Sequence, residues 1–73
     1  MSSVQEEILE HYRYLKSDTK ALITEAQGIR FLTGDPVELA AMLEIERHAE
    51  EILRMIEKME KRMVGDGDNL TSR

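Results

Sequence analysis

The chain has 73 residues, ten Lys and Arg against fifteen Asp and Glu, no Cys, and only two Tyr and one Phe as aromatic residues. This length allows one small domain, and the absence of Cys excludes both a disulfide framework and a thiolate metal site. The net charge of −5 disfavours nonspecific binding to nucleic acid, which requires Lys and Arg to displace counterions.

The sequence also lacks the usual signals for export or membrane insertion. Its N-terminal segment is acidic and has neither the charged start nor the apolar core of a signal peptide. No apolar run reaches the ~20 residues that a membrane-spanning helix needs. We therefore expect a cytoplasmic protein that makes no membrane contact.

A first helix is expected over about residues 3–32. Ser3, followed three residues later by Glu6, matches a capping box, which satisfies backbone N–H groups at a helix start. Apolar residues then repeat every seven positions, and a second row of smaller or amphipathic residues lies three positions before each of them. The first row is Ile8, Leu15, Leu22 and Ile29, and the second is Gln5, Tyr12, Thr19 and Ala26.

A turn is expected over residues 33–35. Gly34 is suited to the left-handed conformation that often follows a helix, Asp35 to an N-cap, and Pro36 to the first position of a new helix. A connection this short requires the two helices to be antiparallel. We expect four apolar residues beside the turn to plug the end of a bundle: Phe31, Leu32, Val37 and Leu39.

A second helix is expected over about residues 36–64. Its apolar residues also repeat in heptads, and Leu43 and Leu53 widen the stripe beyond a narrow coiled-coil seam. Residues 65–73 contain two Gly among polar residues, so we expect a disordered acidic tail. The seam of the second helix is formed by Met42, Ile45, Ala49, Ile52, Ile56, Met59 and Met63.

The predicted fold is all-α: a helical hairpin over residues 1–64 that dimerises into an antiparallel four-helix bundle. A lone hairpin of this length buries little surface, and domains this small usually need a staple or oligomerisation. Because the chain has no Cys, self-association is the expected way to cover both seams. The predicted dimer core consists of Ile8, Tyr12, Leu15, Thr19, Leu22, Ala26, Ile29, Met42, Ile45, Ala49, Ile52, Ile56 and Met59.

The two His residues give little support for metal binding or catalysis. A metal site in a bundle needs Glu-x-x-His facing inward, but the residue three before His48 is the seam residue Ile45. No nucleophile or oxyanion donor accompanies His11. We therefore expect no metal, no cofactor and no catalytic residues, and we predict that the protein is not an enzyme.

One stretch of the first helix has the composition of a nucleic-acid surface. Arg13, Lys16 and Lys20 are spaced three and four residues apart, so we expect them to share one outward face. Tyr14 falls outside both heptad rows and is expected to be partly exposed. An exposed Tyr can stack on a base while the cations meet phosphates. The alternative is an ordinary solvated helix face with carboxylates nearby.

The run Arg13-Tyr14-Leu15-Lys16-Ser17-Asp18-Thr19 resembles the first helix of the repressor-of-primer (Rop) family of plasmid copy-number regulators. The run His48-Ala49-Glu50-Glu51-Ile52-Leu53-Arg54 resembles the second helix of that family, and residues 65–70 resemble its acidic glycine tail. The resemblance implies a homodimeric four-helix bundle that binds a complex of two RNA stem-loops through its paired first helices. In that resemblance, Tyr14 matches the RNA-facing aromatic residue.

The sequence thus leads us to expect a small Rop-like regulatory protein that binds structured RNA as a homodimer, through Tyr14, Arg13, Lys16 and Lys20. The alternative is a protein-binding adaptor that uses its outer acidic helix faces and has no nucleic-acid role. Affinity that falls steeply with salt would indicate RNA, whereas a stoichiometric polypeptide partner would indicate an adaptor.

Overall fold

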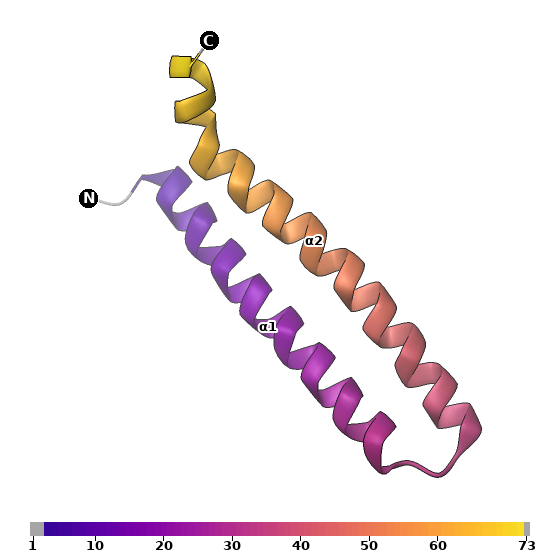
Figure 1. The fold of residues 1–73 in the computed structure, drawn as a ribbon. Helices are drawn as coiled ribbons and strands as arrows, with labels where there is room; N and C mark the ends of the chain where they lie inside the picture. Colours follow the sequence, from indigo (N-terminus) through magenta and orange to yellow (C-terminus); the bar gives the residue numbers. More distant parts are fainter. Residues whose placement is uncertain (1–2, 73) are drawn as a thin grey trace.

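The computed structural model describes residues 3–72, with side chains for residues 3–64, as two antiparallel helices joined by a three-residue turn (Figure 1). α1 spans Val4–Leu32 and α2 spans Pro36–Ser72. The hairpin measures 53 × 29 × 12 Å along its principal axes, so it is a single layer of helices. The predicted all-α helical hairpin is confirmed, and no strand occurs within residues 3–72.

α1 begins with the capping box that the sequence predicts. The Ser3 hydroxyl oxygen accepts a hydrogen bond from the backbone N–H of Glu6 at 3.1 Å, and the backbone N–H of Ser3 donates to Glu6 Oε1 at 3.4 Å. Glu6 and Glu7 also place negative charge in the first turn, where the helix dipole is positive. The start of α1 is therefore stabilised by local interactions alone.

The turn is held by side chains from both of its ends. Thr33 Oγ1 accepts a hydrogen bond from the Asp35 N–H at 3.0 Å, and Asp35 Oδ1 accepts one from the Val37 N–H at 2.9 Å. Asp35 thus caps α2 as predicted. The left-handed conformation predicted for Gly34 is wrong, because α1 ends in an extended residue, Thr33, and Gly34 has no positive φ.

α2 continues to Ser72, whereas the sequence predicts its end near residue 64. Gly65 and Gly67 weaken a helix, but unlike Pro they keep the backbone N–H that the helical hydrogen bonds need. The last turns of α2, yellow in Figure 1, bend away from the axis of the rest of the helix. The side chains of the predicted acidic tail, residues 65–73, lie outside the described part of the chain.

The two helices pack through one heptad row from each, which we call the inner seam. Ala26 and Ala49 are only 3% and 1% exposed, and such small side chains let two helices approach closely. Thr19 is also buried, and its hydroxyl donates to the Leu15 carbonyl oxygen at 2.7 Å, so its polar group is satisfied within α1. The inner seam consists of Tyr12, Thr19 and Ala26 on α1 and Met42, Ala49 and Ile56 on α2.

One side of the inner seam is closed by two ion pairs. Lys16 Nζ lies 2.6 Å from Glu60 Oε1, and Arg30 Nε lies 2.6 Å from Glu46 Oε2. The pairs are two heptads apart on both helices, from 16 to 30 and from 46 to 60, so the antiparallel register is the same at both points. We call this side the polar flank; it consists of Lys16, Ile23, Arg30, Glu46, Leu53 and Glu60, all at least half-buried.

The other side of the inner seam carries the first heptad row of α1 and stays open. We call it the apolar face. Its members keep between 37% and 50% of their surface exposed: Ile8, Leu15, Leu22 and Ile29 on α1, with Ile45 and Ile52 on α2. Of the thirteen residues of the predicted dimer core, four are therefore buried within one chain, Tyr12, Met42 and Met59 are partly buried, and the six of the apolar face stay exposed.

The end of the hairpin is not plugged. Phe31, Leu32 and Val37 are 91%, 87% and 76% exposed, and Leu39 is 38% exposed. Their packing at the end of a dimeric bundle stays a prediction, but within one hairpin they do not pack together. The reason is that the turn has only three residues, and within residues 3–72 no further element lies over it.

The close approach of the helices at Ala26 and Ala49 can be tested by overpacking. We expect Ala49→Leu to lower the free energy of unfolding by about 1–3 kcal/mol, because the added atoms have no space in the inner seam. Ala40→Leu, on an exposed part of α2, should change it by less than about 0.5 kcal/mol. Chemical denaturation at one chain concentration measures both, and equal effects would contradict the close approach.

Candidate functional site

The three cations proposed to contact phosphates, Arg13, Lys16 and Lys20, differ in whether a carboxylate already pairs with them. Lys16 belongs to the polar flank, where its ammonium group pairs with Glu60 and its side chain is 29% exposed. An ion pair held at 2.6 Å neutralises the charge that a phosphate would need. Lys16 therefore acts first as a cross-helix contact of the hairpin.

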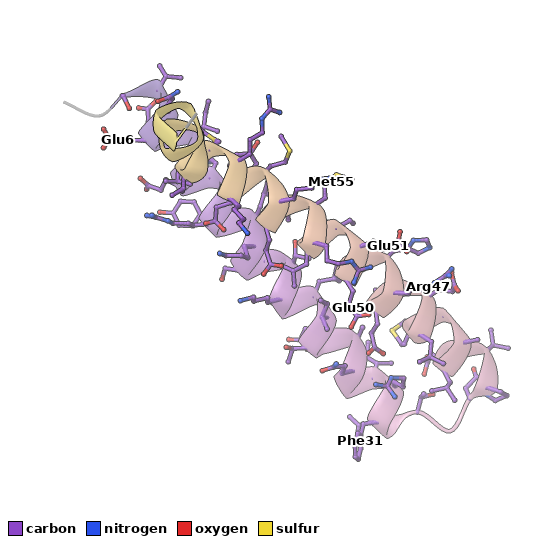
Figure 2. All side chains as sticks on the ribbon, turned by 45° about the horizontal axis from the view of Figure 1, so that its top comes forward. Glu6, Phe31, Arg47, Glu50, Glu51 and Met55 are labelled. Carbon is purple, nitrogen blue, oxygen red and sulfur yellow. The ribbon has the colours of Figure 1, made fainter. Side chains whose placement is uncertain are left out.

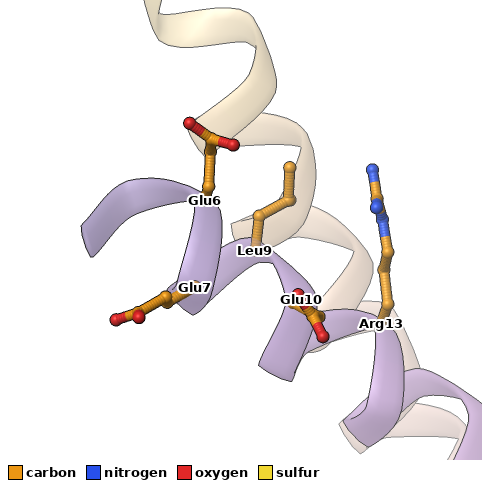
Figure 3. A pocket seen from close by; sticks show the side chains of 5 residues that line it. All are labelled: Glu6, Glu7, Leu9, Glu10 and Arg13. Atoms are coloured by element: carbon orange, nitrogen blue, oxygen red, sulfur yellow. The ribbon is translucent and has the colours of Figure 1, made fainter. Parts of the chain in front are cut away.

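Arg13 and Lys20 are exposed, but Arg13 lies among carboxylates. A shallow pocket on the N-terminal half of α1 is lined by three Glu residues, one Leu and Arg13 (Figure 3). In that view Glu6, Leu9 and Arg13 project to the same side of α1, as their spacing of three and four residues requires. The field of the neighbouring carboxylates reduces the attraction of Arg13 for an anion.

Tyr14 is 57% exposed, as the sequence predicts, but its hydroxyl is already engaged. It donates a hydrogen bond to Glu10 Oε1 at 3.0 Å. This bond and the negative charge of Glu10 raise the pKa of Tyr14, because ionising the phenol would remove the donor and create repulsion. The ring also meets that of His11 edge to face, with centroids 6.3 Å apart.

The basic residues and Tyr14 lie on different sides of α1. Successive helical residues are rotated by about 100°, so Tyr14 lies about 100° from Arg13 and about 160° from Lys16 around the helix axis. The hollow beside Tyr14 is lined instead by Glu7, Glu10 and His11. The aromatic ring thus lies on an acidic surface, and the cations lie toward the polar flank.

The largest candidate interaction surface is the apolar face. Its six residues run along both helices and repeat every seven positions, so the face is a continuous stripe along one side of a single helical layer. Stable domains are built from at least two packed layers around one core. A stripe of half-exposed Leu and Ile along one side of a single layer is therefore a candidate surface for packing against another layer.

The polar flank is the feature that the sequence analysis missed. The residue after each member of the first heptad row of α1 also repeats every seven positions, as Leu9, Lys16, Ile23 and Arg30. Alternation of apolar and basic residues in this row, matched by Glu46 and Glu60 on α2, was a signal for cross-helix ion pairs. The spacing of Arg13, Lys16 and Lys20 instead predicts a single outward stripe of basic residues.

Neither His residue lies in a cluster suited to metal binding. His48 is exposed, and its Nε2 lies 3.3 Å from Glu44 Oε2, one helical turn away. Among the described residues there is no group of three or more His, Asp or Glu side chains placed to hold a metal ion. The helices of this part of the chain also include none that is long and apolar enough to cross a membrane.

Comparison with known proteins returned no match: no family, no curated protein and no solved structure is similar enough to this chain to assign it.

The effect of the hydrogen bond between Tyr14 and Glu10 on the pKa of Tyr14 can be tested. We expect Glu10→Gln to lower the pKa of Tyr14, because the substitution removes the negative charge that opposes ionisation of the phenol. Glu7→Gln is the matched control, since Glu7 lines the same hollow without a recorded hydrogen bond to Tyr14. NMR-monitored titration of the Tyr14 ring measures both, and an unchanged midpoint in Glu10→Gln would argue against the contact.

Proposed function

We propose that this chain is a small non-catalytic regulatory protein that works as a homodimer and acts as an adaptor for another protein. In the proposed dimer, two hairpins pack their apolar faces together into an antiparallel four-helix bundle. The single observation that supports this proposal is the apolar face, whose six Leu and Ile side chains remain 37–50% exposed in one hairpin. Burial of each such side chain contributes roughly 1.5–3 kcal/mol when it is complete.

A second copy of the chain is the occupant that best fits the apolar face. The face has the same heptad spacing on both helices, so an identical stripe can interdigitate with it layer by layer. Packing of one face on its own copy is also the commonest symmetry of soluble oligomers. The flanks and outer faces of the helices would remain free to bind a partner.

Two observations favour a protein partner over RNA. The charge of Lys16 is paired with Glu60, and Tyr14 donates to Glu10 beside another carboxylate. Phosphates close to these carboxylates would be repelled. RNA binding remains the second candidate, since Arg13 and Lys20 are exposed on one side of α1 and the resemblance to the Rop family points the same way.

The dimer can be tested by placing a charge on the apolar face. We expect Leu22→Asp to weaken dimerisation at least about a hundredfold, because burying an unpaired carboxylate costs several kcal/mol and each 1.4 kcal/mol is tenfold. Ala21→Asp is the control, because Ala21 is exposed and lies outside the heptad rows. Sedimentation at micromolar concentration measures the assembly, and a folded single wild-type chain would overturn the proposal.

The choice between RNA and protein can be tested separately. We expect the dimer not to retard a pair of complementary RNA stem-loops in a gel at about 0.15 M salt, where exposed charges are screened beyond ~8 Å. A retarded band that disappears with rising salt and in Tyr14→Ala would instead show that the protein binds RNA. Lys58→Ala, an exposed cation on α2, controls for a general loss of charge.

A further inference from the structure

The turn end of the hairpin combines the most exposed apolar side chains with most of the net charge. Phe31, Leu32 and Val37 have the highest exposed fractions of all large hydrophobic residues among the described side chains, at 91%, 87% and 76%. We call these three residues the tip. Figure 2 shows Phe31 at the end of α1, pointing away from the hairpin.

The half of the hairpin that ends in the tip carries a net negative charge. The segment from Glu25 to Glu50 contains six carboxylates and two Arg, whereas the rest of the chain has nine carboxylates against eight Lys and Arg. The turn end therefore carries a net charge of −4 out of the total of −5. This segment runs from the contact between Ala26 and Ala49 to the turn, on both helices.

Both cations of this segment are already paired. Arg30 pairs with Glu46, and Arg47 pairs with Glu44 at 3.1 Å. Among the described side chains, no ion pair is recorded for the remaining carboxylates, which are Glu25, Asp35, Glu38 and Glu50. Asp35 and Glu38 adjoin the tip in the sequence, whereas Glu25 and Glu50 lie about 9 and 20 Å further along the helices at 1.5 Å per residue.

The tip is also held in a fixed arrangement. The hydrogen bonds of Thr33 and Asp35 fix the turn between the last residues of α1 and the first residues of α2. Val37 donates its backbone N–H to one of these bonds, so its position is set by the cap. A backbone that is already held in place loses less conformational entropy on binding, which favours affinity.

We infer that the tip is a docking surface for a basic amphipathic helix of another protein. The apolar side chains of that helix would cover Phe31, Leu32 and Val37, and its Lys and Arg would face the carboxylates of this half of the hairpin. Aromatic residues, Phe included, are enriched at protein interfaces relative to the rest of the surface. This inference rests on the proposed adaptor function and names the chemistry of its partner.

The apolar face is not the same surface as the tip. The apolar face lies along the length of the hairpin, whereas Phe31 and Leu32 lie in the last turn of α1 and outside its heptad rows. A second copy seated on the apolar face can therefore leave Phe31 exposed. Occupation of the tip by a second copy or by a nonspecific apolar ligand is an alternative outcome of the experiment below.

The experiment uses the full chain, confirmed as a dimer by sedimentation, and a fluorescent synthetic peptide with Leu at helical spacing and Lys elsewhere. We expect binding by fluorescence anisotropy that weakens as salt rises. The double substitution Phe31→Ser with Leu32→Ser should weaken it at least about tenfold, the effect expected for loss of an interface anchor. Met55→Ser is the control, because Met55 is also apolar and exposed but lies far from the turn in α2.

Each other outcome overturns the inference. Equal binding of a peptide with Glu in place of Lys, or unchanged binding in the double variant, would show that the tip is not a site for a basic helix. Weaker dimerisation in the double variant would assign the tip to the second copy. A well-formed dimer that does not bind the peptide would contradict this inference but not the proposed homodimer. A folded monomer would contradict the proposed homodimer.

Discussion

The structure depends on the close packing of two helices along the inner seam. Ala26 and Ala49 are almost fully buried, and the two ion pairs of the polar flank lie two heptads apart on both helices. Small residues at the point of approach allow close helix contact, and the two ion pairs fit the same antiparallel register. Every other surface of the hairpin takes its position from this seam.

The two sides of the inner seam differ chemically, and this difference separates their roles. The polar flank satisfies its charges within the chain through the contacts of Lys16 with Glu60 and of Arg30 with Glu46. Its ion pairs are complete and attract little further. The apolar face has no internal partner, so its contribution to stability depends on what covers it. One hairpin therefore has a side whose charges are paired and a side whose apolar residues are not covered.

The same reasoning explains why α1 is not a simple cationic surface. A Lys in a row next to the seam can reach a carboxylate on the facing helix, and a 2.6 Å contact with Glu60 is stronger than a screened attraction to a distant phosphate. Tyr14 similarly meets a carboxylate one turn away at Glu10. Spacing alone placed Arg13, Lys16 and Lys20 together, but their charges are divided among different neighbours.

The sequence by itself determined the two helices, the turn and the capping residues, because these depend on contacts within four residues of one another, such as Ser3 with Glu6 and Asp35 with Val37. It also identified the apolar rows, since heptad spacing fixes which residues share a helix face. Only the tertiary structure decided which row faces the other helix and which stays open. That choice depends on how small residues and ion pairs match across the seam. The ion pairs join residues 16 and 60 and residues 30 and 46, which are too far apart in the sequence for a local pattern to relate them.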